Sequence, residues 1–196
     1  MNEIPLISIL TFFPLVGALV LALAPSKDGA RLRGLAFGIS MATLLPIGLL
    51  WLNFQTNGAD ASLQFVERHE WIPTLNVEYF VGVDGLGLLM VLLTAIVTPM
   101  AILASGSVAR NPRLYYSLIL FLQAGLYGAF TALNFFHWFL YWELVLIPAY
   151  FLIRNWGGPQ CRAAALQFFI FTMVGSIAML LGFMALFLSA KSFDFM

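Results

Sequence analysis

Charged residues are scarce in this sequence. Lys, Arg, Asp and Glu make up 9% of its 196 residues, whereas hydrophobic residues make up 62%. Soluble globular domains carry about 25% charged and 45–50% apolar residues, so the composition excludes an ordinary soluble domain. Nine basic residues balance nine acidic ones, so the net charge is zero. We therefore expect no basic surface that follows a phosphate backbone and no nucleic acid as a partner.

Cysteine and histidine are almost absent. Cys161 is the single cysteine, so the chain has no internal disulfide and no CxxC pair. His69 and His137 are the only histidines, too few for a haem or a metal cluster. The sequence contains no GxGxxG, no P-loop and no plausible Ser/His/Asp arrangement. We expect no metal, no bound cofactor and no redox chemistry in this chain itself.

Long apolar runs are abundant. A helix needs about 20 apolar residues to cross a hydrocarbon core of roughly 30 Å. Runs of about this length cover residues 4–24, 35–54, 86–105, 114–133, 135–153 and 163–188. No Lys or Arg precedes the first run, which is also longer than the core of a signal peptide, so we expect it to be retained. The sequence predicts an all-α polytopic membrane protein with about six transmembrane helices.

Basic residues gather in alternate connections between these runs. The connections after the first, third and fifth runs hold Lys27, Arg31, Arg33, Arg110, Arg113, Arg154 and Arg162, whereas Arg68 and Lys191 lie on the other side. Cytoplasmic loops carry the excess of Lys and Arg, so the N-terminus is predicted to be outside. The longest connection, residues 55–85, is then an external loop. Its mixture of polar, aromatic and β-branched residues over 71–83 predicts an interfacial hairpin.

Glu143 is the one acidic residue in the middle of an apolar run. It lies eight residues from one end of the run 135–153 and ten from the other, near the bilayer midplane. A carboxylate at that depth costs a few kcal/mol and is by default a functional residue that handles a proton or an ion. The alternative is a structural hydrogen bond to a neighbouring helix. No Lys or Arg lies inside a run, so a buried cationic partner has to come from elsewhere.

Other polar residues in the runs suggest a hydrated path. His137 lies six residues before Glu143, about 9 Å toward the outer end and on a different helix face. It belongs either to an outer proton path or to the interface, where it binds headgroups or a carbonyl. Pro148 disturbs the helix after Glu143 and frees a carbonyl for water. The remaining candidates, each alternatively an interhelical hydrogen bond, are Gln123, Thr131, Gln167, Thr172 and Ser176.

Three separated segments resemble the M-type antiporter-like membrane subunit of NADH:quinone oxidoreductase (respiratory complex I), also called chain 4. They are YFVGVDGLGLLMVLLTAIVTP at 79–99, YWELVLIPAYFLIRNWGG at 141–158 and FFIFTMVGSIAMLL at 168–181. The family's corresponding stretches read FVGVDGLS, WELxLIP and FFLYTLAGS. The resemblance covers essentially the whole chain but only the beginning of the family's fold, whose members are more than twice as long.

The resemblance implies an inverted repeat of five-helix units that builds two half-channels. Residues 1–106 would form helices one to three with the external loop at 55–85, and residues 107–196 would begin the first repeat with helices four to six. Glu143 matches the family's essential proton-accepting and coupling glutamate. The family's buried lysine lies on a helix beyond Met196, and Gln167 stands where many bacterial relatives carry a further lysine.

The function that the resemblance implies is proton translocation in the membrane arm of complex I, coupled to electron transfer from NADH to quinone. FMN, iron–sulfur clusters and quinone would belong to partner subunits. L-type and N-type antiporter-like subunits would be the neighbours in a bacterial inner membrane or an equivalent energy-coupling membrane. Two alternatives stay open: a cation/proton antiporter subunit, and a truncated structural subunit that does not pump.

Overall fold

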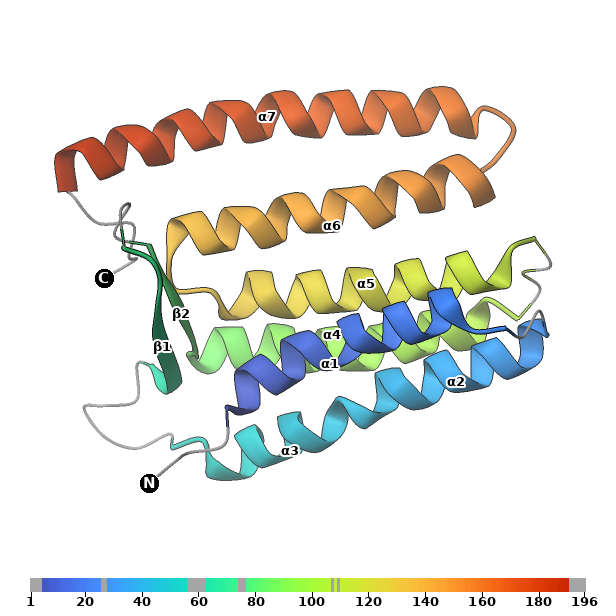
Figure 1. The fold of residues 1–196 in the computed structure, drawn as a ribbon, viewed down its shortest axis with the longest axis horizontal. Coiled ribbons are helices and arrows are strands. Elements are labelled where there is room, and N and C mark those ends of the chain that lie inside the picture. The colour runs from blue at the N-terminus through green and yellow to red at the C-terminus, as the bar shows by residue number, and fades with distance from the viewer. Residues whose placement is uncertain are drawn as a thin grey trace.

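A computed structural model describes residues 5–25, 28–55, 63–73, 77–106, 108 and 110–190. Lys27 and Lys191, which enter the predicted orientation, lie outside these residues. Within them the chain forms helices that run roughly side by side along the long axis, with a β-hairpin at one end (Figure 1). In chain order the elements are α1 (Leu6–Leu23), α2 (Gly29–Ala42), α3 (Leu44–Asn53), β1 (Gln64–Ile72), β2 (Val77–Val83), α4 (Gly85–Ala104), α5 (Pro112–Thr131), α6 (Phe135–Trp156) and α7 (Cys161–Ala190).

The predicted membrane-spanning helices are confirmed. In the described residues, six helices are long and apolar enough to cross a membrane, where α2 and α3 together count as one helix over Gly29–Asn53. Pro46 explains the break between these two, because its missing N–H leaves the carbonyl of Ala42 without the usual helical partner. The hydroxyl of Thr43 at the break donates to the carbonyl oxygen of Ser40 at 2.6 Å.

Several helix ends differ from the apolar runs. The second span begins at Gly29 rather than at residue 35, because the side chain of Asp28 accepts a hydrogen bond from the Ala30 N–H at 3.0 Å and caps the helix. Asn134, the single residue predicted between the fourth and fifth spans, is joined by Ala132 and Leu133 in a short turn. Its side chain caps α6 by accepting from the N–H groups of Phe136 and His137.

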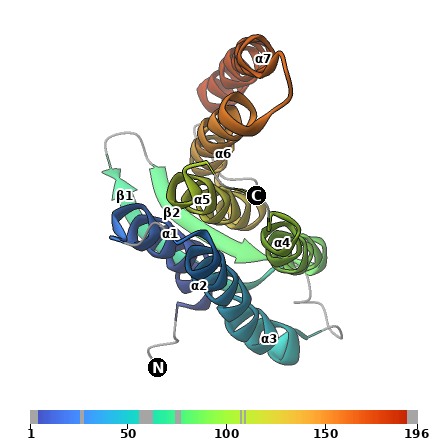
Figure 2. The same ribbon diagram turned by 90° about the vertical axis from the view of Figure 1, so that its right-hand side faces the viewer.

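Helix α5 lies at the centre of the bundle. Viewed along the helices, α1, α4 and α6 surround it, and α7 stands at the edge beyond α6 (Figure 2). Leu120 and Tyr127 of α5 are fully buried in clusters with residues of α1, α2, α3 and α4. By contrast α7 packs mainly on α6 and leaves most of its apolar side chains exposed. Helix α6, which carries Glu143, therefore lies between the packed core and the peripheral helix α7.

The β-hairpin closes one end of the bundle. The expected hairpin over 71–83 is present, but its first strand starts earlier, at Gln64, and pairs antiparallel with the second from Gln64 opposite Val83 to Ile72 opposite Val77. The carboxylate of Glu67 accepts hydrogen bonds from the Ile7 N–H at 2.8 Å and the Ser8 N–H at 3.3 Å. A carboxylate at a helix N-terminus accepts hydrogen bonds from N–H groups that have no partner within the helix. Its negative charge also interacts favourably with the positive end of the helix dipole. Glu67 thus fastens the hairpin to the start of α1.

Candidate functional site

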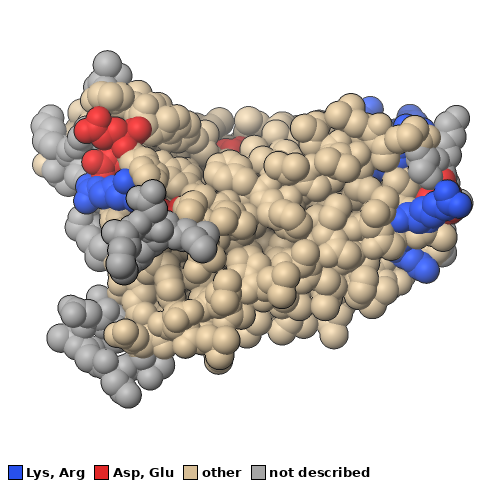
Figure 3. Space-filling view, turned by 60° about the horizontal axis from the view of Figure 1, so that its bottom comes forward, with Lys and Arg blue, Asp and Glu red and all other residues tan. Residues whose placement is uncertain are grey.

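Glu143 lies near the middle of α6 and is only partly exposed. Its oxygen Oε1 is buried and has no hydrogen-bond partner among the described residues. Burying a carboxylate oxygen without a donor is costly, and such a group in a native fold calls for an explanation. The charged residues on the face shown in Figure 3 gather mainly at the two ends of the molecule, so Glu143 has an unusual position for an acid.

Glycines on α5 determine which face of α6 meets the core. A Cβ atom at Gly125 would lie 2.6 Å from Cγ2 of Val145, and one at Gly128 would overlap the ring of Tyr141. Val145 and Tyr141 therefore face α5 at close range. Glu143 is two residues from each, a rotation of about 200°, so its side chain leaves α6 on the side turned away from α5.

Helix α7 covers that other side of α6. The rings of Phe135 and Phe183 lie 4.6 Å apart, and those of Tyr150 and Phe169 lie 5.5 Å apart. Along α6, the first of these contacts lies before Glu143 and the second lies after it. The carboxylate is therefore at the interface of α6 with α7, the least covered helix of the described bundle.

Gln123 lies in a different part of the bundle. It is buried on α5, and its side-chain amide donates to the Tyr127 hydroxyl at 2.9 Å and to Thr43 Oγ1 at 3.3 Å. It therefore joins α5 to the break between α2 and α3. Gly125, which faces α6, is about 200° around the helix from Gln123. Gln123 and Glu143 thus lie on opposite sides of the α5–α6 contact.

His137 lies at the hairpin end of α6. It is 4% exposed. Its ring is hydrogen-bonded to the backbone of Phe80, and its Nδ1 is buried with no partner in the described part of the chain. The rings of Tyr79 and Tyr141 each lie 4.9 Å from it. His137 is therefore part of an aromatic cluster between the hairpin and α6.

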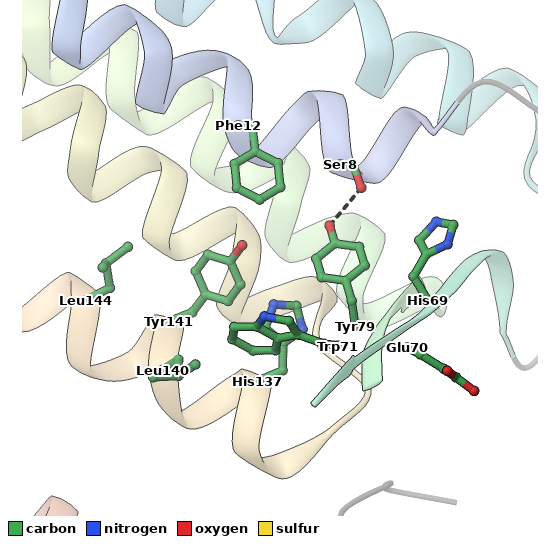
Figure 4. A pocket seen from close by; sticks show the side chains of 10 residues that line it. All are labelled: Ser8, Phe12, His69, Glu70, Trp71, Tyr79, His137, Leu140, Tyr141 and Leu144. Atoms are coloured by element: carbon green, nitrogen blue, oxygen red, sulfur yellow. Dashed lines mark hydrogen bonds between the residues drawn. The ribbon is translucent and has the colours of Figure 1, made fainter. Parts of the chain in front are cut away.

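This cluster borders a cavity of about 520 Å³ between α1, the hairpin and α6 (Figure 4). The Tyr79 hydroxyl lies 2.8 Å from the Ser8 hydroxyl, which in turn donates to Glu67. Burial raises the pKa of the Tyr79 phenol, the hydrogen bond with Ser8 lowers it, and the charge of Glu67 raises it further. Tyr79 is therefore a neutral hydroxyl at physiological pH. The cavity is lined both by polar side chains, among them Ser8, Tyr79 and His137, and by apolar ones such as Phe12 and Leu140.

The other predicted path residues are spread along α6 and α7. Gln167 is exposed on α7. The Thr172 hydroxyl donates to the carbonyl oxygen of Phe168 at 2.8 Å, within its own helix. Thr131 does the same toward the carbonyl oxygen of Tyr127 at 2.9 Å. Pro148 is buried, and α6 continues through it as a helix, although proline offers no N–H to the carbonyl of Leu144. Among the described residues these groups form no single cluster with Glu143.

The contacts among three polar residues at the hairpin end could not be predicted from the sequence. Ser8, Glu67 and Tyr79 come from three elements, and nothing in their spacing indicates that they meet. The signal that was available is an acidic loop predicted on the same side of the membrane as the start of the first apolar run. In the described residues, no group of three or more His, Cys, Asp and Glu side chains is placed to hold a metal ion.

Comparisons with known proteins agree on one family. Residues 34–129 match the family described as NADH-ubiquinone oxidoreductase chain 4, amino terminus. Residues 132–196 match the family described as NADH:quinone oxidoreductase/Mrp antiporter, TM.

Curated relatives include a plastid and an archaeal protein. The chloroplastic NAD(P)H-quinone oxidoreductase chain 4 of Chara vulgaris is 39% identical over 90% of this chain and 36% of its own length. The F(420)H(2) dehydrogenase subunit M of Methanosarcina mazei is 40% identical over 95% of this chain and 37% of its own length. The chain therefore spans little more than a third of the length of these relatives.

Solved structures share the fold. A chain of respiratory complex I from Thermus thermophilus with bound NADH matches with a TM-score of 0.81 at 23% identity, over 96% of this chain and 38% of that one. A chain of the Mrp complex from Dietzia sp. DQ12-45-1b matches with a TM-score of 0.78 at 18% identity, over 96% of this chain and 20% of that one. The helices described here thus have the arrangement of antiporter-like membrane subunits.

Proposed function

The chain belongs to the family of NADH-ubiquinone oxidoreductase chain 4, of which it matches the amino-terminal part, and from this premise we propose that it translocates protons in the membrane arm of an NADH:quinone oxidoreductase. Glu143 is the residue that takes up and releases the proton. The observation that carries this proposal is a buried carboxylate oxygen without a partner in the described chain, midway along a membrane-spanning helix.

The surroundings of Glu143 suit a change of protonation. In the described helices, Lys and Arg lie only toward the helix ends, so no fixed cation of these helices holds the carboxylate in its ionised form. Ionised, Glu143 needs donors from water or from a neighbouring group; protonated, it tolerates an apolar contact. Hydration of the α6–α7 interface therefore favours proton release, and drying of the interface favours proton uptake.

Groups on either side of Glu143 supply a route for the proton. Toward the hairpin end, His137, Tyr79 and Ser8 lie around the cavity and offer ring nitrogens and hydroxyls to water. Pro148 leaves the carbonyl of Leu144 without its helical donor, so that carbonyl can bind water one residue from Glu143. We assign Thr172 and Gln167 to the α7 side of the route and Gln123 to a branch through α5.

The electron chemistry belongs to other subunits. We propose that FMN, iron–sulfur clusters and quinone are bound by partner subunits. L-type and N-type antiporter-like subunits would flank this chain in a bacterial inner membrane or an equivalent energy-coupling membrane. The N-terminus and the β-hairpin would then lie outside, and the arginine-rich end inside.

Replacing Glu143 by Gln tests this function. In vesicles that contain the assembled complex, Glu143→Gln should leave complex assembly intact and lower NADH-driven proton uptake at least tenfold, because an amide cannot take up and release the proton. Glu143→Asp, which keeps a carboxyl group, should retain part of the activity. A Glu143→Gln complex that pumps at the wild-type rate contradicts the proposal.

A further inference from the structure

In the described residues, α6 and α7 carry three buried polar atoms without a hydrogen-bond partner. The first, Nδ1 of His137, belongs to the aromatic cluster at the hairpin end of α6. The other two are Oε1 of Glu143 on α6 and Oγ of Ser176 on α7. Ser176 is 4% exposed, although most residues around it on α7 are exposed. A buried hydroxyl and a buried carboxylate oxygen without partners each carry a desolvation cost, which a hydrogen bond between them would relieve.

Ring contacts between the helices place these two residues at the same level. Phe135 meets Phe183 near one end of the interface, and Tyr150 meets Phe169 near the other. Helices α6 and α7 run antiparallel (Figure 1), so a step forward along α6 corresponds to a step backward along α7. Glu143 lies eight residues after Phe135, and the residue eight before Phe183 is 175. Glu143 also lies seven residues before Tyr150, and the residue seven after Phe169 is 176.

The face of α7 agrees with this register. Ser176 lies seven residues after Phe169 and seven before Phe183, so all three lie on one stripe of the helix. The two phenylalanines touch α6, and Ser176 is therefore directed at α6 between them. Glu143 in turn leaves α6 on the side away from α5.

Ser176 also differs from its neighbours on α7. The hydroxyls of Thr172 and Ser189 each donate to the carbonyl four residues earlier in their own helix. Such a bond is the usual way to satisfy a Ser or Thr inside an apolar helix. The Ser176 hydroxyl makes no such bond in the described structure, so it is free to serve the neighbouring helix.

We propose that Ser176 is a positioning residue for Glu143: its hydroxyl donates a hydrogen bond to Oε1 of the ionised carboxylate, directly or through one water. The same hydroxyl oxygen accepts a hydrogen bond when the carboxyl group is protonated, because a hydroxyl both donates and accepts. Ser176 thereby holds the carboxyl group at the α6–α7 interface in both states. This inference rests on the proposed function of Glu143 as the proton carrier.

The test compares variants in the assembled membrane complex. Infrared difference spectra record the carboxyl stretching band of Glu143, identified by its loss in Glu143→Gln, and vesicle assays record NADH-driven proton uptake. Ser176→Ala should move the band to higher wavenumber, as a carbonyl that loses a hydrogen bond does, and slow proton uptake by roughly tenfold. Ser176→Thr keeps the hydroxyl and should restore both readouts.

Ser40→Ala is the matched control. Ser40 is fully buried on α2 and its hydroxyl also has no partner in the described residues, but it packs away from α6. Its replacement should change neither the band nor the rate. If Glu143→Gln stops proton uptake while Ser176→Ala leaves the band and the rate unchanged, the role of Ser176 is refuted and the proposed function stands. If Glu143→Gln pumps normally, the proposed function fails, and the role assigned to Ser176 fails with it.

Discussion

The carboxylate of Glu67 accepts several hydrogen bonds at the hairpin end of the molecule. It accepts from the N–H groups of Ile7 and Ser8 and from the Ser8 hydroxyl. These bonds satisfy the first turn of α1 and tie it to β1, an element about sixty residues away. Glu67 therefore contributes to joining the β-hairpin to the membrane-spanning bundle.

Glu67→Ala should loosen the start of α1. Loss of several hydrogen bonds to a charged group should lower the free energy of opening of this turn by about 1–3 kcal/mol. Hydrogen exchange followed by mass spectrometry on the purified complex should show faster exchange of the Ile7 and Ser8 amides. Glu78→Ala is the control, because Glu78 pairs with Arg68 on the surface, where ion pairs contribute little. Unchanged exchange in Glu67→Ala would contradict this role.

The ionisation of Tyr79 should make the stability of the hairpin end depend on pH in the alkaline range. Its pKa is raised above the usual 10.0, chiefly by burial. A phenol whose pKa is higher in the folded state stabilises that state fully below pH 10, and the stabilisation is lost as the pH rises through the raised value. The difference in tyrosinate absorbance between the wild type and Tyr79→Phe reports the ionisation of Tyr79, which should occur above pH 10. Ionisation of Tyr79 at or below pH 10 would refute the prediction.

At the scale of elements, the contact between α5 and α6 depends on the absence of side chains on α5. Gly128→Ala would place a methyl group into the ring of Tyr141 and should cost about 1–3 kcal/mol through overpacking. Gly175→Ala on α7 meets no atom within 4 Å and should be neutral or slightly stabilising. Thermal denaturation of the purified complex measures both. Equal melting temperatures for the two variants would contradict the close packing.

The elements differ in how far the sequence could predict them. Apolar length alone predicted every described span, because a hydrocarbon core requires about 20 apolar residues whatever the partners. The start of α2 at Gly29 could not be read from hydropathy, since the cap of Asp28 extends the helix through polar residues. The depth of Glu143 follows from counting, whereas its position opposite Ser176 depends on how α6 and α7 pack.

At the scale of the whole molecule, charge separates the two ends. In the described residues, the end of the bundle opposite to the hairpin carries six arginines, in or next to the ends of helices: Arg31, Arg33, Arg110, Arg113, Arg154 and Arg162. Arg68 lies on the hairpin. Cys161, at the start of α7, lies on the arginine-rich side. A membrane-impermeant maleimide should therefore label Cys161 in inside-out vesicles and not in right-side-out vesicles. Glu70→Cys in a Cys161→Ser background should show the reverse, and labelling of Cys161 from outside would contradict the orientation.

If Glu143 carries the translocated proton, its carboxyl group changes its protonation state during turnover, and this change can be followed directly. Time-resolved infrared spectra of the complex in vesicles, started by adding NADH, should show the carboxyl band of Glu143 appear and disappear with each cycle of proton uptake. Glu143→Gln should abolish this band. A Glu143 carboxyl group that keeps one protonation state throughout turnover, while protons are still pumped, would contradict the account.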